Sequence, residues 1–113
     1  MLKESYLANK RNLPKNAVKI VVTRSAGHML SPSRALLNNY KNGNIDWAEY
    51  VKTFYREMDN PACVAIMKEI KKLAREKDVY LICYEAPGKN CHRYLLMDMI
   101  NKMDDETTNI VDI

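Results

Sequence analysis

Four side chains that can do chemistry lie at or after the end of a short apolar segment in the second half of the chain: Cys83, Glu85, Cys91 and His92. The apolar segment is typical of a buried strand, and Asn90 is a suitable N-cap for a helix that begins just after it. A thiol at a helix N-terminus beside an imidazole has a lowered pKa and forms a thiolate nucleophile. The spacing therefore predicts Cys91 or Glu85 as nucleophile or base, His92 as proton carrier, and Cys83 as a further candidate.

Each of these side chains also has a structural interpretation. A free cysteine is often a small buried hydrophobe, which suits Cys83 on its apolar strand and applies to Cys91 as well. His92 shares a helical face with apolar residues and can equally hydrogen-bond a neighbouring loop from a buried position. A Cys83–Cys91 redox pair is conceivable, but the spacing does not fix the short Cα separation that a disulfide requires. The sequence leaves open whether the two sulfurs meet.

No metal site is predicted, although side chains of the ligand type are present. The candidates are Cys83, Cys91, His92 and His28. Adjacent ligands such as Cys91 and His92 diverge on a helix, and the chain has no C-x-x-C pair. We therefore expect neither a metal ion nor a cofactor.

Two arginines indicate an anion-binding site. Arg24 follows the first predicted core strand, and Arg93 lies in the first turn of the last predicted helix. Guanidinium groups and the free N–H groups of a helix start both favour phosphate or carboxylate. The alternative for Arg93 is an ion pair with Glu85 or Asp98.

Hydrophobic periodicity predicts an α/β fold. Strands are expected at 18–23, 79–85 and 108–113, and helices at 31–41, 46–58, 60–76 and 91–103. Residues 1–16 are polar, so we expect a loosely structured entry segment. Strands joined through helices favour a single small domain, residues 1–113, with a three-stranded, mainly parallel sheet flanked by about four helices. Ligands of such sheets bind beyond the carboxyl ends of the strands, where Arg24 and the Cys83-to-Arg93 segment lie.

Aromatic residues mark one helix face in the middle of the chain. Trp47, Tyr50, Phe54 and Tyr55 recur at helical spacing. This spacing favours a place in the core over a stacking platform for bases. Tyr40 and Tyr94 lie outside the pattern and are candidates for a pocket wall.

Composition favours one cytoplasmic domain with a basic first half. The 113 residues are 47% hydrophobic, enough to bury a core. An odd number of cysteines, three, and the lack of an apolar signal region predict a reduced cytoplasmic protein with free thiols. Residues 1–45 hold eight Lys/Arg against one Glu, which favours an anionic partner. No apolar run approaches membrane-spanning length, so no membrane association is expected.

Several motifs together resemble a known family. They are Val22-Thr23-Arg24, the segment 40–46 (Tyr-Lys-Asn-Gly-Asn-Ile-Asp), Leu81-Ile82-Cys83-Tyr84-Glu85 and Cys91-His92-Arg93. Over most of residues 15–103 the chain resembles the domain of unknown function 488 family, most specifically in the Cys-Tyr-Glu and Cys-His-Arg portions. The resemblance implies a small α/β domain of unsettled activity, and it carries over to Arg24, Cys83, Glu85, Cys91, His92 and Arg93. His28 has no matching family position.

These patterns together predict an uncharacterised protein with a Cys/His/Arg/Glu pocket at the strand carboxyl ends. The pocket would act on or bind a phosphorylated ligand, a nucleotide or a nucleic acid. The alternative is a noncatalytic module for nucleic acid or protein, in which the Cys-His-Arg turn only stabilises the fold. Whether the chain is an enzyme remains undecided by its sequence.

Overall fold

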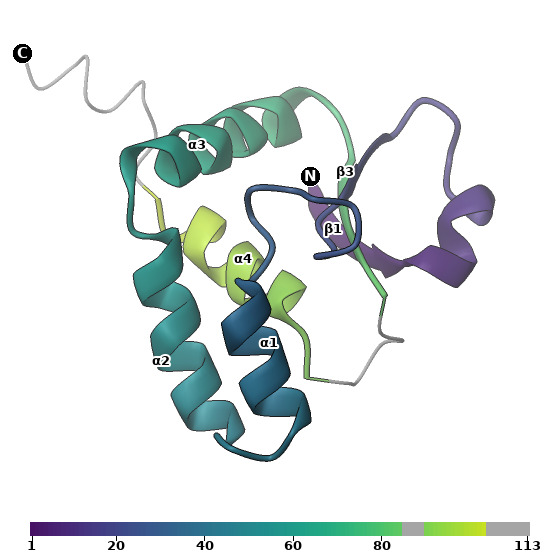
Figure 1. Ribbon diagram of the computed structural model, residues 1–113. Coiled ribbons are helices and arrows are strands. Elements are labelled where there is room, and N and C mark those ends of the chain that lie inside the picture. Colours follow the sequence, from purple (N-terminus) through teal and green to yellow (C-terminus); the bar gives the residue numbers. More distant parts are fainter. Residues whose placement is uncertain (85–89, 104–113) are drawn as a thin grey trace, which may run out of the picture.

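The protein is built on a three-stranded parallel sheet. The computed structural model describes residues 1–84 and 90–103. The sheet has the order β1-β3-β2, with β1 at Leu2–Tyr6, β2 at Val18–Val21 and β3 at Val79–Cys83. Both neighbours run parallel to β3, so the carboxyl ends of all three strands meet at one edge (Figure 1). This confirms the predicted α/β fold with a parallel sheet.

Four α-helices and one short 3-10 helix accompany the sheet among the described residues. They are η1 (Leu7–Asn12), α1 (Arg34–Lys41), α2 (Trp47–Met58), α3 (Pro61–Glu76) and α4 (His92–Asn101). Side-chain caps start two of them at residues 46 and 60, where these helices were expected to begin. Asp46 accepts the Glu49 N–H at the start of α2, and Asn60 accepts the Cys63 N–H at the start of α3. None of the described helices is both long and apolar enough to cross a membrane.

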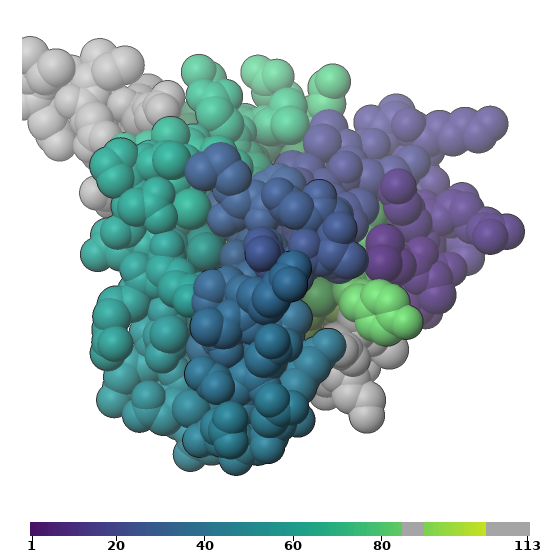
Figure 2. Space-filling view, in the orientation of Figure 1, coloured from purple at the N-terminus to yellow at the C-terminus, as the bar shows by residue number. Residues whose placement is uncertain are grey.

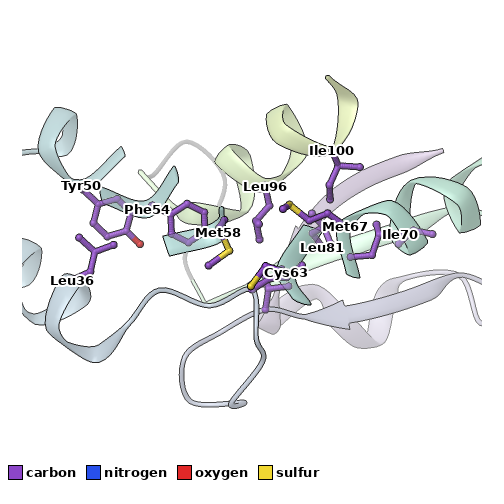
Figure 3. Packing of buried hydrophobic residues seen from close by; sticks show 13 residues of the cluster. Leu36, Tyr50, Phe54, Met58, Cys63, Met67, Ile70, Leu81, Leu96 and Ile100 are labelled. Atoms are coloured by element: carbon purple, nitrogen blue, oxygen red, sulfur yellow. The ribbon is translucent and has the colours of Figure 1, made fainter. Parts of the chain in front are cut away.

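The core lies between the sheet and the helices. The central strand pairs with a neighbour at both of its edges, and its residues Val79, Leu81 and Ile82 have no exposed surface. Figure 3 shows Leu81 close to Met67 of α3, in a cluster that also includes Phe54 of α2 and Leu96 of α4. Helix α4 contacts β1, β3, α2 and α3, so it joins the sheet to the helices around it. Its first turn is thereby held against the end of β3.

Three predictions of local structure are wrong. Residues 1–16 are not a loose segment, since Leu2–Tyr6 form β1 and η1 follows. β1 is an edge strand, and an edge tolerates the polar, partly buried residues that suggested a loop. Helix α1, expected from residue 31, begins at Arg34 after the cap Ser33, and the N-cap of α4 is Cys91 rather than Asn90. The strand predicted at 108–113 lies outside the described residues.

Candidate functional site

Two sulfur atoms and one imidazole meet at the carboxyl end of the sheet. Cys83 is the last residue of β3, Cys91 is the N-cap of α4, and His92 is its first residue. Cys83 and Cys91 are joined by a disulfide bond. Nδ1 of His92 lies 3.8 Å from Sγ of Cys83 and 3.7 Å from Sγ of Cys91. We refer to these three residues as the sulfur–imidazole cluster.

The cluster forms because Cys91 is not yet helical. Its backbone is extended, with φ −151° and ψ 144°. Neighbouring side chains would diverge on a helix, but this conformation turns Cys91 and His92 toward the same point. The argument that adjacent ligands diverge is therefore wrong here, and the expected free thiols of Cys83 and Cys91 are bonded to each other. Only Cys63, buried on α3, is a free cysteine.

The imidazole of His92 is held in one tautomer. Its Nε2 lies 2.6 Å from the carbonyl oxygen of Val22, just after β2. A carbonyl oxygen only accepts, so Nε2 carries the proton and the lone pair of Nδ1 faces the two sulfurs. Burial is the main reason that the pKa of His92 falls to about 4, and the nearby charges of Arg93 and His28 lower it further. The ring is therefore neutral near pH 7, in the buried and hydrogen-bonded position that the sequence allowed.

A cleft of about 650 Å³ opens in front of the cluster. Its described lining residues are Thr23, Arg24, Ser25, Gly27, Pro32, Arg34, Leu37, Tyr40, Lys41, Trp47, Tyr50, Cys83, Tyr84, Asn90, Cys91 and His92. This lining includes three cations, Arg24, Arg34 and Lys41, and within residues 1–84 and 90–103 it includes no carboxylate. Figure 2 looks onto this side of the molecule, where α1 lies near the green end of β3. The cleft therefore joins a basic rim to a floor that contains two sulfurs and an imidazole.

Helix α1 brings two of these cations, Arg34 and Lys41, to the cleft, and neither was predicted as a site residue. Positions 34, 37 and 41 share one helix face, so Arg34, Leu37 and Lys41 all reach the cleft. The start of α1 is fixed to α2 through Ser33, whose backbone N–H donates to Oε1 of Glu57 at 2.9 Å. Its hydroxyl donates to the same carboxylate. The i, i+7 spacing of Arg34 and Lys41 after a serine cap was the signal available in the sequence.

The predicted site residues do not all reach the cleft. Arg24 does, as an exposed side chain after β2. Arg93 does not line it. Its side chain has no exposed surface, and its Nε lies 3.0 Å from Oε2 of Glu4 on β1. This partner was not predicted because β1 was not. Asp98 pairs instead with Lys102 and accepts from Tyr55.

The remaining candidates have other surroundings. His28 does not line the cleft, and its Nδ1 accepts the N–H of Leu30. Glu85 lies outside the described residues, so its catalytic role stays a prediction. Asn90 donates to the hydroxyl of Tyr40 at 3.3 Å rather than capping the helix. Tyr40 lines the cleft as expected of a pocket wall, whereas Tyr94 packs against Arg93.

The aromatic helix face is largely core, as predicted. Tyr50 and Phe54 are buried, and Trp47 packs partly buried against them, with its ring 4.8 Å from that of Tyr50. Trp47 and Tyr50 nevertheless reach the inner wall of the cleft. Tyr40 completes this wall, 5.5 Å from Trp47 between ring centroids. The cleft thus has an aromatic side as well as a basic one.

The fold and the site define a small α/β protein with a Cys-Cys-His cluster beyond the carboxyl ends of a parallel sheet. A family model described as the active DUF488-N3 subclade matches residues 7–104. The chain therefore belongs to the DUF488 family, which confirms the resemblance noted in its sequence. No curated protein and no solved structure matches the chain.

Proposed function

We propose that the cleft binds a phosphate-bearing ligand, a nucleotide or a segment of nucleic acid, and that the sulfur–imidazole cluster acts on it. The observation that carries this proposal is the convergence of Arg24, Arg34 and Lys41 on one cleft whose described lining holds no carboxylate. Guanidinium groups bind phosphate oxygens in pairs, and like charges gathered around a concave surface raise the local concentration of anions.

The aromatic wall favours a ligand that carries a base. Tyr40 and Trp47 line the same cleft as Arg24 and Ser25 of the exposed loop after β2. Bases stack on aromatic rings with little regard to their identity, and each such contact contributes about 1–3 kcal/mol. A nucleotide would use both sides of the cleft, whereas inorganic phosphate would use only the basic rim.

The chemistry would require the reduced form of the cluster. With the disulfide opened, a cysteine thiol would be the nucleophile, and the lone pair of Nδ1 of His92 would accept its proton as the sulfur attacks. The reducing cytoplasm, which the sequence analysis favours, would supply this form. The matching family model is described as an active subclade, which supports a catalytic role.

The burial of the sulfur–imidazole cluster favours a second candidate function, in which the cluster only stabilises the fold. Cys83, Cys91 and His92 are each at most 5% exposed, and their disulfide ties β3 to the start of α4. In this case the cleft binds its ligand without acting on it, and modifying the thiols would change stability rather than binding.

The test compares two matched ligands and two matched variants. We expect AMP to bind more tightly than adenosine, measured by calorimetry at low salt. Arg34→Gln should weaken AMP binding at least about tenfold, as expected for a charge-assisted contact of about 1.5–3 kcal/mol. Lys68→Gln removes an exposed positive charge from α3, away from the cleft, and should leave AMP binding unchanged. Equal affinities for AMP and adenosine, or equal effects of the two variants, would contradict the proposal.

A further inference from the structure

The three atoms of the sulfur–imidazole cluster have the composition of a metal site. Sγ of Cys83, Sγ of Cys91 and one ring nitrogen of His92 all lie within 4.8 Å of one another. We propose that the dithiol form of the protein binds one divalent metal ion of the zinc type through Cys83 Sγ, Cys91 Sγ and His92 Nδ1. This inference does not rest on the proposed function, because it concerns the floor of the cleft and needs no anion.

The distances from nitrogen to sulfur fit tetrahedral coordination. Zinc–sulfur bonds of about 2.3 Å and zinc–nitrogen bonds of about 2.0–2.1 Å place the two ligand atoms about 3.6 Å apart at a tetrahedral angle. Nδ1 of His92 lies 3.8 and 3.7 Å from the two sulfurs. An ion placed between these atoms would therefore require little movement of the imidazole.

The backbone spacing of the cysteines also suits a bridging ion. Their Cα atoms are 7.4 Å apart, whereas disulfides usually join Cα atoms about 4.4–6.8 Å apart. Two thiolates on one tetrahedral zinc lie about 3.8 Å from each other, farther than bonded sulfurs. Opening the disulfide and turning the two side chains would supply this separation without moving β3 or α4.

A hydrogen bond already prepares His92 to be a ligand. Metal-binding histidines usually donate their other ring N–H to a carboxylate or a backbone carbonyl, which fixes the ring and the tautomer. Nε2 of His92 makes this contact with Val22, and Nδ1 is left with its lone pair toward the sulfurs. The ligand is therefore oriented before any ion arrives.

The ligand set selects the kind of metal and leaves one coordination position open. Two thiolates and one imidazole suit zinc, whereas magnesium and calcium prefer oxygen ligands. All three residues line the cleft, so a water molecule or a ligand in the cleft would take the fourth position. His28 does not line the cleft, and its Nδ1 accepts the N–H of Leu30, which leaves the proton of the neutral ring on Nε2. Three protein ligands and one open position are typical of catalytic zinc.

Binding and disulfide formation exclude each other. The ion replaces the two thiol protons, which are released to solvent, and no electron is transferred. In the oxidised protein both sulfurs belong to the disulfide, so neither can bind the ion as a thiolate. The inference therefore predicts metal binding by the reduced protein and none by the oxidised one.

Cobalt titration of the reduced full-length chain tests the inference directly. Under anaerobic conditions and without phosphate ligands, we expect one equivalent of Co²⁺ to give thiolate charge-transfer and tetrahedral d–d bands, which zinc then removes. His92→Gln should abolish these bands, because its amide can still donate to Val22 but offers no atom at the Nδ1 position. Cys63→Ser is the matched control, since Cys63 lies in the core on α3, and it should leave the bands unchanged. No bands, or equal effects of both variants, would overturn the inference.

A second measurement needs no variant. In the reduced unmodified protein, zinc at ten times its dissociation constant should slow alkylation of Cys83 and Cys91 more than about tenfold, and a chelator should restore it. Cys63 serves as the internal reference, because its rate should not depend on zinc. If the alkylation rates of Cys83 and Cys91 are the same with and without zinc, the cluster is not a metal site. That result would leave AMP binding by the cleft unaffected.

Discussion

The guanidinium of Arg93 forms an ion pair with Glu4, with Nε 3.0 Å from Oε2, and this pair ties the first turn of α4 to the edge strand β1. Arg93 has no exposed surface, whereas the Glu4 side chain is 25% exposed. The pair therefore places a positive charge inside the fold and balances it with a carboxylate from the other end of the sequence. Arg93 thus differs in position from Arg24, Arg34 and Lys41, whose side chains line the cleft.

Removing the carboxylate of this pair should destabilise the protein. Glu4→Gln leaves the buried charge of Arg93 less well compensated, and we expect a loss of about 3 kcal/mol in the free energy of unfolding. Urea unfolding measures this loss, and AMP binding at a temperature where the variant is folded should be unchanged. A stable Glu4→Gln variant with weakened AMP binding would instead place Arg93 in the ligand site.

Acid should destabilise the oxidised, metal-free protein through His92. The pKa of His92 is about 4 in the folded chain and near 6.5 when the residue is exposed. Between these values the unfolded chain binds more protons, so stability is complete above about pH 6.5 and falls as the pH drops toward 4. The loss attributable to His92 approaches about 3 kcal/mol. Urea unfolding at a series of pH values measures it, and His92→Gln should show a flatter dependence over this range.

Reducing the disulfide should lower stability by a moderate amount. The bridge joins residues eight positions apart, and closing so short a loop in the unfolded chain is worth about 2.5 kcal/mol. We expect this difference in the free energy of unfolding between the oxidised and reduced protein, measured in the presence of a chelator. Cys63→Ser should show the same difference. A difference near zero would mean that other contacts of α4 alone fix the cluster.

The salt dependence of oligonucleotide binding should distinguish the cleft cations from other exposed cations. If a single-stranded oligonucleotide binds in the cleft, each cation that contacts a phosphate adds about 0.7 to the slope of log affinity against log salt. Arg24→Gln and Arg34→Gln should each reduce the slope by about this amount, as fluorescence anisotropy can show. Lys68→Gln should leave it unchanged, and equal slopes for all three variants would contradict binding in the cleft.

Sequence patterns predicted the features that depend on local interactions. The caps Asp46 and Asn60 act on N–H groups only three residues away, so their role follows from the residues themselves. The strand β3 was predictable because a central strand is apolar on both faces. Strand β1 was missed because its pairing depends on residues more than seventy positions away, and its own polar side chains suggest a loop.

The site was predictable in its residue types but not in its geometry. Cys83, Cys91 and His92 were identified as candidates, whereas their meeting depends on the extended backbone of Cys91, which no local pattern signals. The position of Arg93 could be predicted only by knowing that residues 2–6 form β1, because its partner Glu4 lies on that strand. Predicting that Arg34 and Lys41 reach the cleft would have required the contact between Ser33 and Glu57, which orients α1 toward the cleft.

Val22 links the cluster to the sheet through both of its backbone groups. Its N–H donates to the carbonyl oxygen of Ile82, and its own carbonyl accepts from His92. A change of oxidation state or of metal occupancy at the cluster will therefore reach the hydrogen bonding of a residue more than sixty positions earlier in the chain. Hydrogen–deuterium exchange at the Val22 amide is then a label-free reporter of the cluster, read from a residue that takes no part in its chemistry.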